Sequence, residues 1–229
     1  MSKGLFITAT GTDIGKTYIA ALLLKTMRNA GYHCGYYKAA ASGAARIDES
    51  DAGFVNQFSN LGQAKESLLS YLYKTPVSPH LAAQIEGNPL CMDKIAADYR
   101  KVCAEYDFVV TEGSGGIVCP IRWDDESHIL LEDIVKQLSL PALVVADAGL
   151  GTINATVLTV HYLNQRQIPV VGIIMNHYSG NEMQSDNIKM VEALTGVPVV
   201  ATVKRGDTVL NMSADKMEKL FDAEAQPCV

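Results

Sequence analysis

The sequence predicts an α/β fold, in which a mainly parallel β-sheet is flanked by helices. Short apolar runs rich in Val, Ile and Leu recur along the chain with little alternation, which is typical of strands buried on both faces. Helical segments separate these runs, as expected for a parallel sheet. The strands are predicted at residues 5–8, 107–111, 142–146 and 170–175, with weaker candidates at 34–37 and 198–203.

Helices are predicted where apolar residues recur at helical spacing. One apolar segment covers residues 18–27, a second carries Ile95, Tyr99, Val102 and Tyr106, and a third carries Ile188, Val191 and Leu194. No change of composition marks a linker, so residues 1–229 are predicted to form a single domain. The last nine residues, 221–229, are expected to fray.

Composition and charge favour a small-molecule enzyme. The 229 residues are 48% hydrophobic, enough for a substantial core, and the net charge of -6 argues against nucleic-acid binding. The five cysteines show no C-x-x-C pair and are interpreted as reduced thiols. No run reaches the roughly 18 apolar residues of a membrane span, and the N-terminus does not match a signal peptide. A cytoplasmic protein with no membrane partner is therefore expected.

The strongest local signal is a phosphate-binding loop. The run at residues 5–8 leads into ATGTDIGKT (residues 9–17) and then into a helix, so loop amides and the helix N-terminus would face phosphate oxygens. Lys16 would reach the terminal phosphates, and Thr17 would place its hydroxyl on Mg²⁺. The standard pattern G-x4-G-K-S/T needs Gly where Thr10 stands, so this is a variant loop. It predicts a fold of the P-loop NTPase type.

Four further side chains are candidates for the site. Lys38 and Ser42 are predicted just beyond the carboxyl end of the second strand, where α/β sheets bind ligands, although Lys38 could equally be a surface lysine. Asp51 and Glu112 could bind Mg²⁺. A helix N-cap is the alternative for Asp51, whereas Glu112 closes a strand beside glycines and is better placed.

Two other segments are candidates for ligand contacts. The turn of Gly113, Ser114, Gly115 and Gly116 is predicted to be too flexible to serve packing, and its amides could approach phosphate. Asn176 could read a base edge or simply form a turn. No Ser/His/Asp or Cys/His arrangement suggests covalent catalysis.

These segments, in this order, resemble the dethiobiotin synthetase family over about residues 4–205. The matching motifs are GTDIGKT, YKAAASG, ESDA, SPHLAA, EGSGG, GTINATVLT and GIIMN. The resemblance implies an ATP- and Mg²⁺-dependent ring closure in a P-loop fold, usually in a homodimer. In that reaction 7,8-diaminopelargonate and carbon dioxide form a carbamate, ATP phosphorylates it, and the second amine attacks to give dethiobiotin, ADP and phosphate.

The same resemblance implies roles for individual residues. Lys16 and Lys38 would be catalytic, and Thr17, Asp51 and Glu112 would hold Mg²⁺. Substrate would contact Thr12, Lys38, Ser42 and Gly116. Asn176 would read adenine, and the ATP-binding set would be Asp13, Ile14, Gly15, Lys16, Thr17, Tyr18, Asp51, Glu112, Gly113, Ser114, Gly115, Asn176, His177, Val203 and Lys204. The stretch ATVKRGD replaces the family's Pro-containing base-binding turn, so nucleotide preference stays open.

Two alternatives remain. Cobyrinic acid diamide synthetases share the variant loop and carboxyl activation, but they normally add a glutaminase domain, for which 229 residues leave no room. ParA-like or MinD-like switch ATPases carry an additional lysine near the start of the loop. Thr8, Ala9 and Thr10 occupy that region here.

Overall fold

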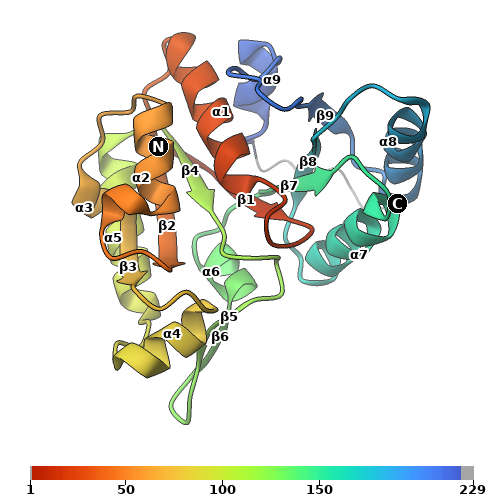
Figure 1. Cartoon of the computed structure of the whole chain (residues 1–229). Coiled ribbons are helices and arrows are strands. Elements are labelled where there is room, and N and C mark those ends of the chain that lie inside the picture. Colours follow the sequence, from red (N-terminus) through yellow and green to blue (C-terminus); the bar gives the residue numbers. More distant parts are fainter. Residues whose placement is uncertain (1, 223–229) are drawn as a thin grey trace.

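The computed structural model describes residues 2–222 of the chain, and its centre is a parallel β-sheet. Seven of the strands in this part of the chain form the sheet, in the order β3-β2-β4-β1-β7-β8-β9 (Figure 1). Their bounds are β1 Lys3–Ala9, β2 Cys34–Ser42, β3 Leu69–Tyr73, β4 Phe108–Glu112, β7 Ala142–Asp147, β8 Val170–Asn176 and β9 Val199–Thr202. The predicted α/β fold with a mainly parallel sheet is confirmed.

All six strands predicted from apolar runs are present, but β2 is longer than predicted. It extends through Ser42 because it pairs with β4 on one side and with β3 on the other. Lys38 therefore lies inside the strand and Ser42 ends it, so the prediction that both lie beyond the strand was wrong. The edge strand β3 was not predicted, because its alternating burial gives it no continuous apolar run.

Helices cover both faces of the sheet (Figure 1). Leu5 and Ile7 of β1 pack in one core cluster with residues of α1, while Phe6 packs in the other with residues of α5 to α8. The helices are α1 Lys16–Asn29, α2 Asp51–Phe58, α3 Lys65–Leu68, α4 Pro79–Glu86, α5 Met92–Glu105, α6 Leu131–Gln137, α7 Thr152–Gln165, α8 Glu182–Thr195 and α9 Ala214–Lys219, with a 3-10 turn at Ile47–Glu49. The three predicted helical segments fall within α1, α5 with the residue that follows it, and α8.

A short antiparallel hairpin, β5 (Pro120–Trp123) and β6 (His128–Leu130), lies beside α4 and was not predicted. The fraying expected from residue 221 is wrong at its start, because Phe221 is buried and its ring packs edge-on against Phe108. Residues 223–229 of that prediction lie outside the described residues.

Cys34, Cys91, Cys103 and Cys119 are free thiols, as predicted; Cys228 lies outside the described residues. None of the helices in the described part of the chain combines the length and apolarity that a membrane crossing requires.

Candidate active site

The phosphate loop joins β1 to α1, and its backbone requires glycine at one position. Gly15 lies in the left-handed region with φ 101°, and a Cβ there would meet the Asn176 side-chain nitrogen at 2.3 Å. Asp13 also has a positive φ, of 60°. The loop leads directly into the first turn of α1, where the backbone amides at the helix N-terminus have no partner within the helix. This arrangement forms an anion site without any further group.

Asn176, at the end of β8, fixes the loop from the side. It is 3% exposed and its Nδ2 donates a hydrogen bond to the Ile14 carbonyl at 2.8 Å. The neighbouring His177 Nδ1 lies 2.6 Å from Asp147 Oδ2. Neither contact was foreseen from the sequence. Asn176 therefore has a loop-positioning contact in addition to the roles considered for it.

The predicted base-binding residues Val203 and Lys204 follow β9, next to the end of β8 that carries Asn176. Val203 is 1% exposed and its backbone pairs with Met175 and Tyr178, so its side chain belongs to the core. Lys204 is exposed and its backbone amide donates to Asp207 Oδ2 at 2.8 Å. Tyr18 donates its hydroxyl hydrogen to the Asp207 carbonyl, which ties α1 to this segment.

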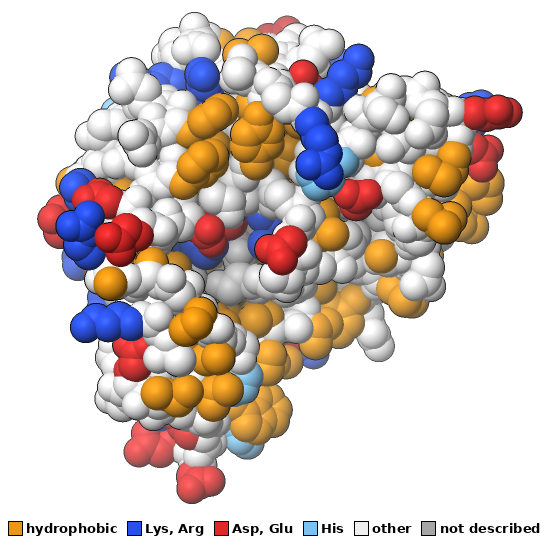
Figure 2. Space-filling view, in the orientation of Figure 1, with side chains coloured by type: hydrophobic (Ala, Val, Ile, Leu, Met, Phe, Trp, Pro, Cys, Tyr) orange, Lys and Arg blue, Asp and Glu red, His pale blue; other side chains and the backbone are white. Residues whose placement is uncertain are grey.

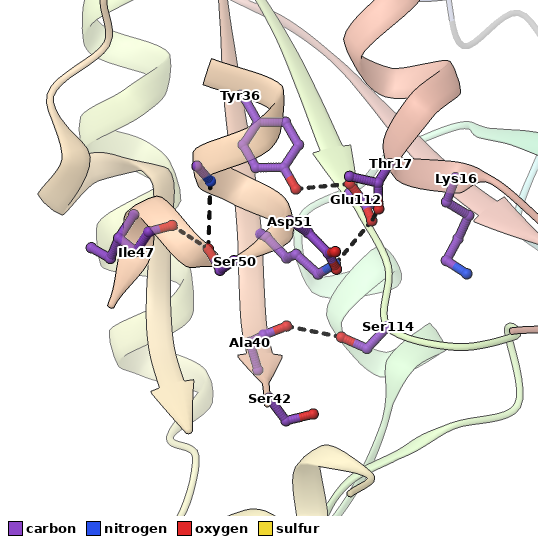
Figure 3. Close-up of polar contacts among 12 residues, drawn as sticks. Lys16, Thr17, Tyr36, Ala40, Ser42, Ile47, Ser50, Asp51, Glu112 and Ser114 are labelled. Carbon is purple, nitrogen blue, oxygen red and sulfur yellow. Dashed lines mark hydrogen bonds and ion pairs between the residues drawn. The ribbon is translucent and has the colours of Figure 1, made fainter. Parts of the chain in front are cut away.

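A cluster of charges lies where β2 and β4 meet α1 (Figure 3); Lys38 and Glu112 are buried in it, whereas the Asp51 side chain is 52% exposed. Lys38 and Glu112 are register partners in the parallel pair β2–β4. Lys38 Nζ donates to Glu112 Oε1 at 2.9 Å and to Asp51 Oδ2 at 2.5 Å, and Thr17 Oγ1 donates to the same Glu112 oxygen at 2.7 Å. Lys38 is 3% exposed, so it is not a surface lysine. Ser50, not Asp51, caps α2, which removes the N-cap alternative for Asp51.

The electrostatics of the two lysines differ. Burial disfavours the charge on Lys38, but the facing carboxylates of Glu112 and Asp51 outweigh burial and raise its pKa. Burial also acts on Asp51, where the Lys38 ammonium outweighs it and lowers the pKa. Burial is the largest effect on Lys16 and lowers its pKa, and its Nζ donates to the Gly11 carbonyl at 3.3 Å. Within residues 2–222, Lys38 has carboxylates at contact distance and Lys16 has none.

One cavity of about 480 Å³ connects the loop to this cluster. Figure 2 views the molecule from this side, with acidic and basic side chains close together near the middle of the face. Predicted residues that line the cavity are Thr12, Asp13, Lys16, Lys38, Ser42, Asp51, Glu112, Gly113, Ser114, Gly115 and Gly116. The remaining predicted residues, Ile14, Gly15, Thr17, Tyr18, Asn176, His177, Val203 and Lys204, do not line it. Ser42 Oγ donates to the Val77 carbonyl at 2.6 Å, at the edge of the cavity.

The glycine turn after β4 is partly a packing feature, contrary to the prediction. A Cβ on Gly113 would lie 2.7 Å from the Phe6 ring and 3.0 Å from a Leu131 methyl carbon, so the close approach of β1 and α6 requires glycine there. Gly116 has no atom nearer than 3.7 Å to such a Cβ, although its nearest neighbours are backbone atoms of Ala9 and Gly11. Gly116 thus has room for a Cβ, whereas Gly113 does not, although both line the cavity.

The donor set fits Mg²⁺. Thr17 Oγ1, Asp51 and Glu112 offer only oxygen atoms, the type that Mg²⁺ prefers. Within residues 2–222 no group of three or more His, Cys, Asp or Glu side chains could hold a metal by itself. A set of two carboxylates and one hydroxyl suits an ion that completes its shell with phosphate oxygens and water.

The sequence missed several residues of the site. Tyr36 donates its hydroxyl hydrogen to Glu112 Oε2 at 2.8 Å, and Val77, Pro79, Val118, Cys119 and Pro120 form apolar parts of the cavity wall. A signal for Tyr36 exists: it lies two residues before Lys38 in an extended strand, so both side chains point to the same face. Among the wall residues, Pro79 begins α4 and Pro120 begins β5, while the others come from loops, and no comparable pattern marks them.

The fold and the loop define a P-loop nucleotide-binding protein. Solved structures of a ParA family ATPase from Chlorobium tepidum (TM-score 0.56, 13% identity, covering 96% of this chain and 89% of that one) and of the MinD cell division protein from Aquifex aeolicus (TM-score 0.56, 12% identity, 96% and 87%) share this fold. At such identities they show the fold alone.

Sequence comparison gives the family. A family model described as an AAA domain matches residues 3–213. The chain is 48% identical to the ATP-dependent dethiobiotin synthetase BioD of Brachyspira hyodysenteriae, covering 97% of this chain and 100% of the relative. It is 46% identical to that of Clostridium botulinum strain Loch Maree, covering 97% and 99%. The chain belongs to the dethiobiotin synthetase family, as the motifs predicted.

Proposed function

We propose that the protein is an ATP-dependent dethiobiotin synthetase of biotin biosynthesis, with 7,8-diaminopelargonate, carbon dioxide and ATP as substrates. Its relatives carry this name. The observation that carries the proposal is a single cavity in which the phosphate loop faces the buried Lys38. Its volume of about 480 Å³ is within the range of small-molecule sites, about 300–1,000 Å³.

The polar and apolar lining residues of the cavity suit different parts of the diamino acid. Thr12, Lys38, Ser42 and Gly116 would contact its diamine end, where the carbamate forms. Val77, Pro79 and Val118 provide an apolar wall against which an aliphatic chain can pack. The substrate carries its two amines near one end and a carboxylate at the other, and the aliphatic chain between them fits the apolar wall.

The reaction needs charge neutralisation and positioning more than a protein nucleophile. One amine of the substrate combines with carbon dioxide to form a carbamate. A carbamate oxygen attacks the γ-phosphorus of ATP, and ADP leaves. The second amine then attacks the carbonyl carbon, phosphate leaves, and the ureido ring closes. Lys38 would offset the carbamate charge, and Lys16 would neutralise charge on the transferring phosphoryl group.

Thr17, Asp51 and Glu112 would hold Mg²⁺, which when bound supplies charge neutralisation at the phosphates. Loop residues 13–18 and the amides of 113–115 would contact ATP, and Asn176 with His177 would lie toward the base. Because its side chain is buried, Val203 could offer only backbone groups, next to the exposed Lys204.

We further propose a cytoplasmic homodimer. A second copy would cover two exposed apolar side chains: Leu150, which precedes α7 and is 93% exposed, and Leu158, which lies on α7 and is 62% exposed.

The decisive experiment incubates the purified protein with ATP, Mg²⁺, bicarbonate and 7,8-diaminopelargonate. Phosphate release and dethiobiotin, detected by mass spectrometry, should rise together in a ratio of about one, since each turnover cleaves one ATP. ATP hydrolysis that is independent of the diamino acid would favour a switch ATPase. Hydrolysis stimulated by a different carboxylate would favour another carboxyl-activating synthetase.

A further inference from the structure

Tyr36 is a buried residue whose hydroxyl contacts the charge cluster at Glu112, although Tyr36 does not line the cavity. It is 0% exposed, and its hydroxyl donates to Glu112 Oε2 at 2.8 Å (Figure 3). The other Glu112 oxygen, Oε1, accepts from Thr17 at 2.7 Å and from Lys38 at 2.9 Å. The two oxygens of Glu112 thus have separate partners. The Tyr36 bond fixes the rotation of the carboxylate, so that Oε1 faces the phosphate loop.

The backbone of Tyr36 is itself held by a side chain. Strand β3 pairs with β2 only from Lys38 onward, so Tyr36 has no neighbouring strand on that side. Gln63 replaces the missing strand: its Oε1 accepts from the Tyr36 amide and its Nε2 donates to the Tyr36 carbonyl, both at 2.8 Å. Gln63 is 3% exposed and is fixed in turn by Asn56 and Ser67. A continuous buried network therefore runs from Gln63 through Tyr36 to Glu112.

We propose that Tyr36 is a positioning residue that orients Glu112 toward Thr17 and the divalent cation. The proposal rests on the proposed function, in which Glu112 binds Mg²⁺. Tyr36 lies behind Glu112 and does not line the cavity, so it acts through the carboxylate and touches no substrate. Loss of such an outer partner of a metal ligand typically costs about 10- to 100-fold in metal affinity or activity.

The neighbouring Tyr37 offers a matched control. It is also 0% exposed, and its hydroxyl contacts Ser70 Oγ at 2.6 Å and the Ile95 carbonyl at 3.1 Å, on the opposite face of β2. Tyr36→Phe and Tyr37→Phe each remove one buried, hydrogen-bonded hydroxyl and leave a partner without its donor. We expect similar losses of stability from both, measured by urea unfolding. Only Tyr36→Phe removes a contact to Glu112.

The test measures binding of Mn²⁺, a spectroscopic substitute for Mg²⁺, to the full-length protein with ADP, from the electron paramagnetic resonance signal of free Mn²⁺. We expect Tyr36→Phe to weaken Mn²⁺ binding about 10-fold or more, while Tyr37→Phe stays within about twofold of wild type. The Mg²⁺ concentration that gives half-maximal rate should shift by the same factor. Equal Mn²⁺ affinities of the two variants would overturn the proposal.

Two further outcomes keep the test decisive. If the wild type binds Mn²⁺ no better than a Glu112→Gln variant, the metal role of Glu112 in the proposed function fails and the positioning role fails with it. If Tyr36→Phe does not fold, Gln63→Met takes its place, because it releases the Tyr36 backbone while leaving the hydroxyl in the chain. It should weaken Mn²⁺ binding in the same direction by a smaller factor, and an unchanged affinity would refute the network.

Discussion

Replacing Lys38 with methionine removes the cation that balances Glu112 in the interior. The Glu112 side chain is 0% exposed, and its remaining donors, Thr17 and Tyr36, are neutral. Breaking a buried ion pair by removing one partner costs about 3–5 kcal/mol, because the other charge is left uncompensated. At about 2–4 °C per kcal/mol for a chain of this size, the melting temperature of Lys38→Met should fall by about 6–20 °C.

The double variant Lys38→Met/Glu112→Gln separates charge from packing. Glutamine keeps the shape of Glu112 but carries no charge, so the double variant should cost about 1–3 kcal/mol less than the sum of Lys38→Met and Glu112→Gln, the size of coupling expected for contacting residues. The assay is urea unfolding at neutral pH with EDTA. The variants are compared provided that the slope of the unfolding free energy against urea concentration is unchanged. Lys65→Met is the control: Lys65 and Asp48 form an exposed pair at 2.8 Å, and its loss should cost no more than about 1 kcal/mol. If the single-variant costs simply add within about 0.5 kcal/mol, the reasoning is refuted.

Two more predictions concern Lys16 and the glycine turn. Burial lowers the pKa of Lys16 below its ordinary value of 10.5, so Lys16 loses its charge at a lower pH than a free lysine does. If the reaction needs that charge, kcat/KM should fall on the alkaline side at a pH below 10.5. In Lys16→Arg the fall should move to higher pH, because arginine stays charged. The same fall in wild type and Lys16→Arg would exclude Lys16 as its source. Gly113→Ala should lose about 1–3 kcal/mol in urea unfolding, because its Cβ would lie 2.7 Å from Phe6, whereas Gly116→Ala, with 3.7 Å of clearance, should change stability little; equal losses would contradict the packing argument.

The sequence predicted those parts of the fold and site that depend on local order. The apolar runs located six strands because a parallel sheet buries both faces of each strand, and the phosphate loop was located because its glycine, lysine and threonine are consecutive. The strand β3 and the β5–β6 hairpin were missed because alternating burial in short segments gives a weak pattern.

The side-chain contacts of the site depend on strand order, which local sequence does not contain. Lys38 and Glu112 are 74 residues apart and become partners only because β2 and β4 are neighbours in register. The same pairing brings Tyr36 to Glu112, 76 residues away. For Gly113 the missing information was the ring of Phe6 on the adjacent strand β1. The sequence of a glycine turn does not show whether the turn is flexible or tightly packed, because this depends on which strand lies next to it.

The charge balance of the site connects this geometry to its chemistry. Lys16 and Lys38 supply two positive charges. Asp51 and Glu112 supply two negative charges, and both form ion pairs with Lys38. The four groups are therefore formally neutral together, although the proposed substrates, a triphosphate and a carbamate, are anions. The carboxylates that hold Lys38 in the interior are also the oxygen ligands that suit Mg²⁺. A bound divalent cation would make the cluster net positive, which is the sign that both substrates require. The pairing that makes a buried lysine stable leaves these four groups without net positive charge, so under the proposed function a bound metal ion would add to the attraction that the loop amides exert on phosphate.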